Sequence, residues 1–242
     1  MWRGYHKFSK VKFEELASWP STFPVDSPSG NVLVDGGAKY CMIWDGLFDG
    51  EQTLLDAVLQ SADLAGYGPA LLNQGDDKQE IGELNESIRK GERAIFESEE
   101  LAGRIWDVLA PLMPAREVVP GKRYATWRAV GVNPTLRVLK YKAADAFELH
   151  QDGSYSRTST SGEKQRSFMT LQIYLNSGGG IDFTGGATRV FCCTDEPVIV
   201  ADVVPRRGRV LLFQHNIWHI GEAVSAGEKL VLRTEILFAE EG

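Results

Sequence analysis

The stretch RVLLFQHNIWHIGEAVSAGEKLVLRTEILFA, residues 209–239, contains two runs rich in Val, Leu, Ile and Phe on either side of a polar segment. Runs of this length and composition are typical of β-strands. Earlier in the chain, after Pro120, similar runs are separated by Gly-rich or charged turns: Thr135 to Tyr141, Ser167 to Asn176, Thr188 to Cys193 and Pro197 to Val203. Because no helical pattern lies between them, the sequence predicts an antiparallel sandwich or barrel.

The region before Pro120 has a different pattern. After Glu51, apolar residues recur at intervals of three and four, which predicts an amphipathic helix. Ser98 has the character of an N-cap for a second helix, which Pro111 ends. The first forty residues predict an extended arm, and the polar stretch from Asn73 to Glu92 predicts a long loop of the kind that often covers a site.

These patterns predict two parts of unequal character. Residues 1–115 are expected to form the arm and a helical support region, and residues 116–242 the β domain. The 242 residues are 43% hydrophobic and 24% charged, which is usual for a globular chain. The formal net charge of −7, with no offsetting basic run, argues against nucleic acid or an anionic membrane surface as the main partner.

The cysteines and the apolar segments bear on location. The three cysteines, Cys41, Cys192 and Cys193, include no Cys-x-x-Cys pair, and this odd set favours a reducing compartment. No stretch approaches the apolar length of a membrane span, and the first ten residues lack the apolar core of a signal peptide. We therefore expect a cytoplasmic protein with no membrane partner, and the sequence leaves the oligomeric state open.

The candidate chemistry centres on His150 and Asp152, which follow a strand-like segment. Residues two apart in an extended backbone project from the same face. An imidazole and a carboxylate on one face, with a second imidazole, form the facial triad that binds iron(II) and leaves coordination positions open. The third donor is either His215 or His219, and strand alternation does not separate them because they are four residues apart.

Two cations lie on one face of the last strand-like run, at Lys229 and Arg233. In a protein of net charge −7, inward-facing cations on a core-like strand need an anionic partner, since an unpaired buried charge is costly. A dicarboxylate co-substrate would supply that partner.

Several motifs occur in a particular order along the chain. They are Leu136–Tyr141, His150–Gly153, Thr170–Asn176, Gly185–Thr188, His219 and Lys229. This order resembles the prolyl 4-hydroxylase-like branch of the iron(II)/2-oxoglutarate dioxygenases, over about Arg128 to Phe238. The resemblance implies a double-stranded β-helix, that is, a jelly-roll with the N-terminal helices packed on the outside of one sheet.

The resemblance also implies roles for particular residues. His150, Asp152 and His219 would bind Fe(II), and Lys229 would bind the distal carboxylate of 2-oxoglutarate. Arg233 is left open between the co-substrate, an acidic group of the substrate and Glu235. The positions that usually line the co-substrate pocket in such enzymes are Tyr141, Tyr174 and Thr188.

The activity implied is hydroxylation of an organic substrate with O₂, coupled to decarboxylation of 2-oxoglutarate to succinate and CO₂. Ascorbate is a further candidate cofactor. A prolyl residue in a protein and a free amino acid or other small molecule are both candidate substrates, and a non-catalytic metal-binding jelly-roll is the weakest alternative. Arg89, Arg93, Tyr155 and Arg157 are candidates for substrate contact.

Overall fold

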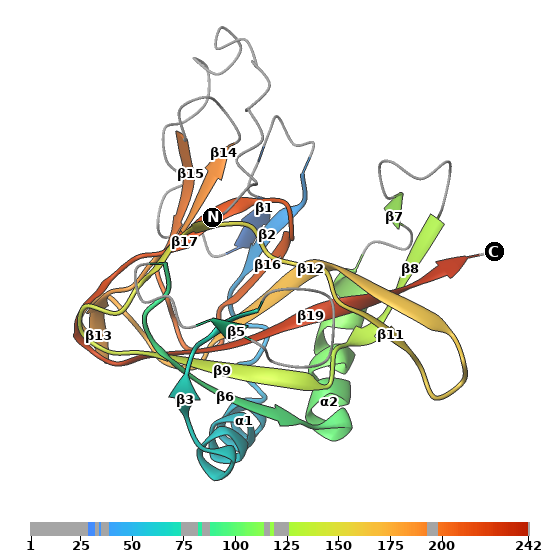
Figure 1. The fold of residues 1–242 in the computed structure, drawn as a ribbon, viewed down its shortest axis with the longest axis horizontal. Coiled ribbons are helices and arrows are strands. Elements are labelled where there is room, and N and C mark those ends of the chain that lie inside the picture. The colour runs from blue at the N-terminus through green and yellow to red at the C-terminus, as the bar shows by residue number, and fades with distance from the viewer. Residues whose placement is uncertain are drawn as a thin grey trace, which may run out of the picture.

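The architecture is mainly β. A computed structural model of the chain describes residues 29–31, 34, 39–73, 82–83, 88–113, 117–118, 126–192 and 198–241. Two α-helices and two facing antiparallel sheets account for most of these residues (Figure 1). The expected jelly-roll class with added helices is therefore confirmed. Most of the expected N-terminal arm and most of the expected loop between Asn73 and Glu92 lie outside the described residues.

The larger sheet has eleven strands. Its central path runs, in spatial order, through β1 (Ser29–Asn31), β2 (Cys41–Trp44), β16 (Val210–Gln214), β12 (Lys164–Tyr174), β19 (Lys229–Glu241), β9 (Thr135–Tyr141), β6 (Glu92–Glu97) and β3 (Gly68–Pro69). Three strands lie off this path: β7 (Glu117–Val118), β8 (Thr126–Val132) and β11 (Ser156–Thr158). The strands predicted after Pro120 are thus present, with ends shifted by a few residues.

The smaller sheet has four strands. In spatial order they are β10 (Phe147–His150), β17 (Trp218–Gly221), β14 (Thr188–Cys192) and β15 (Val198–Val203). The remaining described strands form two sheets of two strands each. They are β13 (Phe183–Gly185) with β18 (Val224–Gly227), and β4 (Leu72–Asn73) with β5 (Gly82–Glu83).

The two helices lie together on the side of the large sheet away from β14, β15 and β17 (Figure 1). Helix α1 (Gln52–Ala65) buries the face predicted from its apolar spacing, including Leu54, Leu55 and Val58. Helix α2 (Glu99–Leu109) begins as predicted, because the Ser98 hydroxyl accepts a hydrogen bond from the backbone N–H of Leu101. A 3₁₀ turn at Ala110–Leu112, which contains Pro111, follows it.

Strand alternation gives the large sheet two different faces. On β12, Leu171 and Ile173 pack in the apolar core beneath the helices. Tyr174, the residue after Ile173, faces the other way and packs in a second core between the two sheets. The space between the sheets is therefore lined by every second residue of β9, β12 and β19, which is where the polar candidates lie.

Four strands of the large sheet, β1, β2, β3 and β6, come from the region expected to supply only the arm and helices. Strand β6 pairs with β9 along its whole length, and β2 pairs with β16. Strand β6 could not be predicted from composition, because its apolar segment is short and charged residues lie at both of its ends. The pairing with β9 stabilises it, so a strand that is weak by composition is fixed by its neighbour.

Candidate functional site

His150 and His219 face each other across two strands of the small sheet. They are register partners in the antiparallel pair β10–β17, and directly opposed residues have their side chains in contact. Their ring centroids are 4.1 Å apart. A bulge between Phe147 and His150 re-aims this end of β10, so that the Phe147 ring stacks on the His150 ring at 3.5 Å.

Asp152 completes a cluster with the two histidines. Its Oδ1 lies 3.8 Å from Nε2 of His150, and its Oδ2 lies 3.8 Å from Nε2 of His219. One ligand atom from each residue lies within 4.8 Å of the others, so the three side chains could hold a metal ion. The expectation that His150 and Asp152 converge on one side is met, although Asp152 lies two residues beyond the end of β10.

The protonation of this cluster suits a cation. Nδ1 of His150 and Nδ1 of His219 each donate to a backbone carbonyl, of Glu148 and Ile217 respectively, at 2.6 and 3.0 Å. Such contacts fix the tautomer and leave Nε2 with its lone pair free. Burial lowers the pKa of His150 to about 3 and also lowers the pKa of His219, so both rings are neutral at pH 7.

Asp152 is held ionised and in a fixed orientation. Burial alone raises the pKa of its carboxyl, but Arg233 and the two imidazoles hold that pKa well below its usual range. Arg233 Nη2 lies 2.8 Å from Oδ1, and the Thr170 hydroxyl donates to Oδ2 at 2.5 Å. Two neutral imidazoles and one carboxylate, each anchored by a second contact, fit a divalent transition metal.

His215 is not part of this cluster. It lies in the turn between β16 and β17, is 7% exposed, and finds no hydrogen-bond partner for either ring nitrogen among the described residues. Its backbone contributes instead, since its carbonyl accepts a hydrogen bond from the backbone N–H of Asp152 at 2.9 Å.

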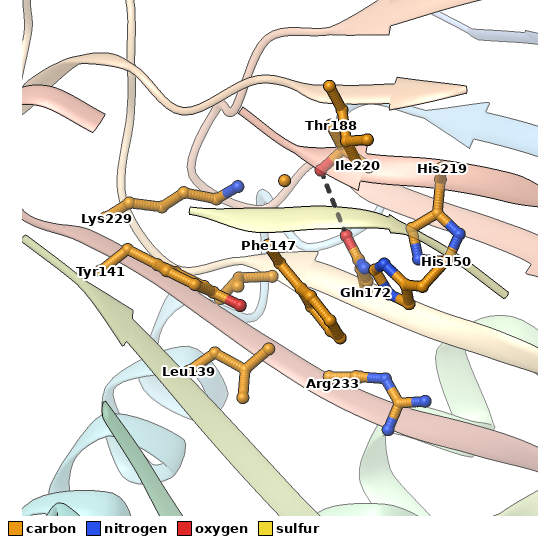
Figure 2. A pocket seen from close by; sticks show the side chains of 12 residues that line it. Leu139, Tyr141, Phe147, His150, Gln172, Thr188, His219, Ile220, Lys229 and Arg233 are labelled. Atoms are coloured by element: carbon orange, nitrogen blue, oxygen red, sulfur yellow. Dashed lines mark hydrogen bonds between the residues drawn. The ribbon is translucent and has the colours of Figure 1, made fainter. Parts of the chain in front are cut away.

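A pocket of about 380 Å³, a volume that includes its opening to solvent, extends from the two histidines to Lys229 (Figure 2). Of the residues considered from sequence, it is lined by Tyr141, His150, Thr188, His219, Lys229 and Arg233. Tyr174 is not in the lining: it is fully buried, and its hydroxyl donates to the Thr188 hydroxyl at 2.7 Å.

The lining also contains residues that sequence analysis missed. They include Leu139, Phe147, Gln172 and Val231. Strand alternation could have found Gln172, because it lies midway between Thr170 and Tyr174, but an amide carries no motif of its own. Phe147 depends on the bulge in β10, which the sequence does not reveal.

The two cations of β19 occupy different environments. Lys229 is 3% exposed, donates to the backbone carbonyl of Gly186 at 2.7 Å, and lies 5.6 Å from the ring centroids of Tyr141 and Tyr174. Burial lowers the pKa of Lys229 to about 7. Arg233, by contrast, contacts the carboxylates of Asp152 and Glu235.

The candidates for substrate contact are distributed differently. Arg89 is buried, with its guanidinium 4.7 Å from the centroid of the Phe147 ring, so it contacts a residue that lines the pocket. Arg157 contacts Gln165 and Glu99, and Arg93 is buried on β6. Tyr155 donates its backbone N–H to the Ser167 hydroxyl.

Comparison with known proteins agrees with this geometry. Residues 136–234, which contain the whole cluster and Lys229, match the family model described as the 2OG-Fe(II) oxygenase superfamily, where 2OG is 2-oxoglutarate. This match covers the part of the chain that carries the His-Asp-His cluster and the strand with Lys229. A search of curated protein sequences found no match.

Two solved structures have a fold similar to that of this chain. The viral collagen prolyl hydroxylase from Paramecium bursaria Chlorella virus-1 is 17% identical, with a TM-score of 0.50 over 84% of this chain and 98% of that one. A Pseudomonas putida prolyl-4-hydroxylase is 15% identical, with a TM-score of 0.50 over 85% and 96%. The resemblance noted in the sequence is thus confirmed for the superfamily and for the fold.

None of the described helices is both long and apolar enough to cross a membrane.

Proposed function

We propose that this protein is an Fe(II)- and 2-oxoglutarate-dependent dioxygenase that hydroxylates an organic substrate. In the same proposal, residues 116–242 form its catalytic domain and residues 1–115 the support region. One observation carries it: a single pocket is lined at one end by the two histidines of the His-Asp-His cluster and at the other end by a buried lysine. A metal-chelating dicarboxylate is the ligand that such a pocket suits.

The cluster His150, Asp152 and His219 is the proposed iron site. The two imidazoles present neutral Nε2 atoms, and the carboxylate is ionised before any metal arrives. Binding therefore requires no protein group of this cluster to lose a proton at pH 7. Three donors on one side of the ion leave positions for co-substrate and O₂.

Lys229 is the proposed partner of the distal carboxylate of 2-oxoglutarate. Four residues of strand separate it from Arg233 beside the cluster, roughly 13 Å of backbone. The hydroxyls of Tyr141 and Thr188 line the space between, and Tyr174 supports Thr188 from behind. Arg233 is assigned to positioning Asp152, since both of its described ion pairs are with protein carboxylates.

The proposed reaction converts 2-oxoglutarate, O₂ and a C–H bond of the substrate into succinate, CO₂ and a C–OH group. Iron, when bound, supplies the redox chemistry that couples the decarboxylation to the oxygen transfer. The protein's own residues orient the reactants and exclude water: Leu139, Phe147 and Val231 give the pocket apolar walls.

A prolyl residue in a protein is the proposed substrate. Support comes from the fold, which is shared with two prolyl hydroxylases from a virus and a bacterium. Use of ascorbate and a cytoplasmic location remain predictions. Cys41 is free and buried, as expected in a reducing compartment.

The test is an anaerobic titration of purified protein with Fe(II) and then 2-oxoglutarate. Bidentate chelation gives a weak visible charge-transfer band, which we expect in the natural protein and not in His150→Ala. Succinate formation should then require a prolyl-containing peptide. Iron binding without a band would identify a metal-binding jelly-roll that does not use 2-oxoglutarate, and a band with no peptide-dependent succinate would direct the search to free amino acids and other small molecules.

A further inference from the structure

Gln172 is a buried polar side chain inside the pocket, to which neither the family match nor the motifs assign a role. It lies on β12 between Thr170 and Tyr174, on the face turned toward the small sheet. Its neighbours Leu171 and Ile173 point into the core beneath the helices. Gln172 is 8% exposed, so its amide has little access to bulk water.

The orientation of the Gln172 amide is set by a chain of hydroxyls. The Tyr174 hydroxyl donates to the Thr188 hydroxyl at 2.7 Å, and the Thr188 hydroxyl donates to Oε1 of Gln172 at 3.4 Å (Figure 2 shows the second contact). Burial raises the pKa of Tyr174, so the phenol keeps the proton that it donates. Because Oε1 accepts from Thr188, the two N–H groups on Nε2 are directed elsewhere.

Those two N–H groups have no hydrogen-bond partner among the described residues. Nε2 of Gln172 is not among the fully buried unpartnered atoms of the described residues, so its N–H groups are open to the pocket, where an acceptor on a ligand would replace water. The pocket is where a partner can be supplied, because Gln172 lines it. An amide N–H has no charge to lose and cannot act as a base, so its function there is to donate to an acceptor.

The strand register places Gln172 toward the metal-site end of the pocket. Its partner on β19 is Arg233, which contacts Asp152, and Thr170, two residues earlier, also contacts Asp152. In the other direction, Tyr174 pairs with Val231, and Lys229 lies two residues further along β19. Gln172 is therefore one side-chain repeat from the iron-site end, and Lys229 is further away.

We propose that the Gln172 side-chain amide donates to the oxygens of the 2-oxo acid group of the co-substrate, opposite the carboxylate that Lys229 binds. This rests on the proposed function and adds a second contact to it. A ligand with acceptor oxygens at both ends would pair with the Lys229 ammonium group at one end and accept hydrogen bonds from the Gln172 amide at the other. Gln172 thereby selects for a 2-oxo acid in one orientation.

The test compares two variants. Gln172→Met removes the amide N–H donors, and Gln172→Glu keeps the side-chain shape but replaces those donors with an acceptor oxygen. Gln165→Met is the matched control: Gln165 lies on the same strand, is equally buried at 8% exposed, and does not line the pocket. The affinity of each Fe(II)-loaded protein for 2-oxoglutarate is measured anaerobically from the charge-transfer band. Fe(II) affinity is measured separately on the same samples.

We expect Gln172→Met to weaken 2-oxoglutarate binding about tenfold or more, as loss of a hydrogen bond to a charged group implies. Gln172→Glu should weaken it further, and Gln165→Met should leave it unchanged. Fe(II) affinity should be the same in all four proteins, and the band maximum should move in Gln172→Met because the ligand's oxygens lose a donor. Unchanged affinity and band position in Gln172→Met would overturn the assignment.

A second ligand locates the contact. 2-Oxopentanoate keeps the 2-oxo acid group and lacks the distal carboxylate, so Gln172→Met should weaken both ligands by the same factor. A loss confined to 2-oxoglutarate would place Gln172 at the distal carboxylate and contradict the proposal. If the natural protein itself shows no band with 2-oxoglutarate, the proposed function fails, an outcome distinct from a normal band that Gln172→Met does not change.

Discussion

Lys229 and Arg233 are two cations on the same face of one strand, four residues apart, and the structure gives them opposite surroundings. Arg233 lies between the carboxylates of Asp152, at 2.8 Å, and Glu235, at 3.3 Å. Glu235 is in turn held by Arg137 and Asn133. Among the described residues, the Lys229 ammonium group contacts a backbone carbonyl and two aromatic rings, and the charge that acts on it is that of Glu222.

The difference supports the proposal that an anion binds at the Lys229 end of the pocket. The Arg233 end is already balanced, because two carboxylates and two guanidiniums form a closed network there. The Lys229 end has a buried cation with little compensation, which is why its pKa is lowered to about 7. We therefore interpret Lys229, whose charge has little compensation, as a binding residue, and Arg233, whose charge is compensated, as a residue that supports the structure.

The largest expected effect comes from the balanced end, where iron is proposed to bind. His219→Ala should abolish Fe(II) binding and all succinate formation, since two donors do not complete the facial set. His215→Leu is the control, as His215 is equally buried and outside the cluster. Isothermal titration with Fe(II) or Mn(II) measures the effect. Metal binding lost in His215→Leu and kept in His219→Ala would reverse the assignment.

Next in size is Lys229→Met, which removes the uncompensated cation. We expect 2-oxoglutarate affinity to fall by about thirtyfold or more, as for truncation of one partner of a buried charge pair. Fe(II) affinity should not change. Lys142→Met is the control, because Lys142 is exposed and pairs with Glu92. Equal losses in Lys229→Met and Lys142→Met would contradict the assignment of Lys229 as the partner of the distal carboxylate.

Arg233→Met tests the structural side of the comparison. It leaves Asp152 without its guanidinium partner, so the free energy of unfolding should fall by roughly 3 kcal/mol. The affinity of iron-loaded protein for 2-oxoglutarate should change only about two- to threefold, less than the loss of a charge-assisted contact. Arg189→Met, which breaks a more exposed pair with Asp202, should cost less than about 1 kcal/mol. Urea unfolding and the band titration check the two quantities, and a thirtyfold loss of affinity in Arg233→Met would make it a co-substrate residue.

The smallest expected effect is on pH dependence. The folded-state pKa of Lys229, about 7, lies below its usual value of 10.5, so the unfolded chain binds more protons between these values. The metal-free protein should therefore gain stability as pH rises from about 7 toward 10.5, and Lys229→Met should lack that contribution. Co-substrate binding favours the protonated lysine, so affinity should weaken above pH 7 in the natural protein only. Parallel pH profiles in the two proteins would contradict this.

Much of the fold was predictable from local patterns. The apolar runs after Pro120 gave the strands, because a strand with one face in each core needs apolar residues at every second position or throughout. The spacing after Glu51 and the N-cap at Ser98 gave the two helices. Strands β2 and β6 were missed, because their stability comes from pairing with β16 and β9 and not from their own composition.

The sequence by itself determined the candidate residues: a His-x-Asp pair, a later histidine and a cation on the last strand, in an order that resembles the 2-oxoglutarate dioxygenases. Strand alternation left His215 and His219 open and the family resemblance chose His219; the tertiary structure gives the physical reason, because His215 lies in the turn after β16 while strand pairing sets His219 opposite His150. It also decided that Arg233 is paired and Lys229 is not, and that Gln172 faces the pocket. Residue type and spacing are local properties, whereas the partner of a buried charge or amide depends on strands that meet only when the sheets close.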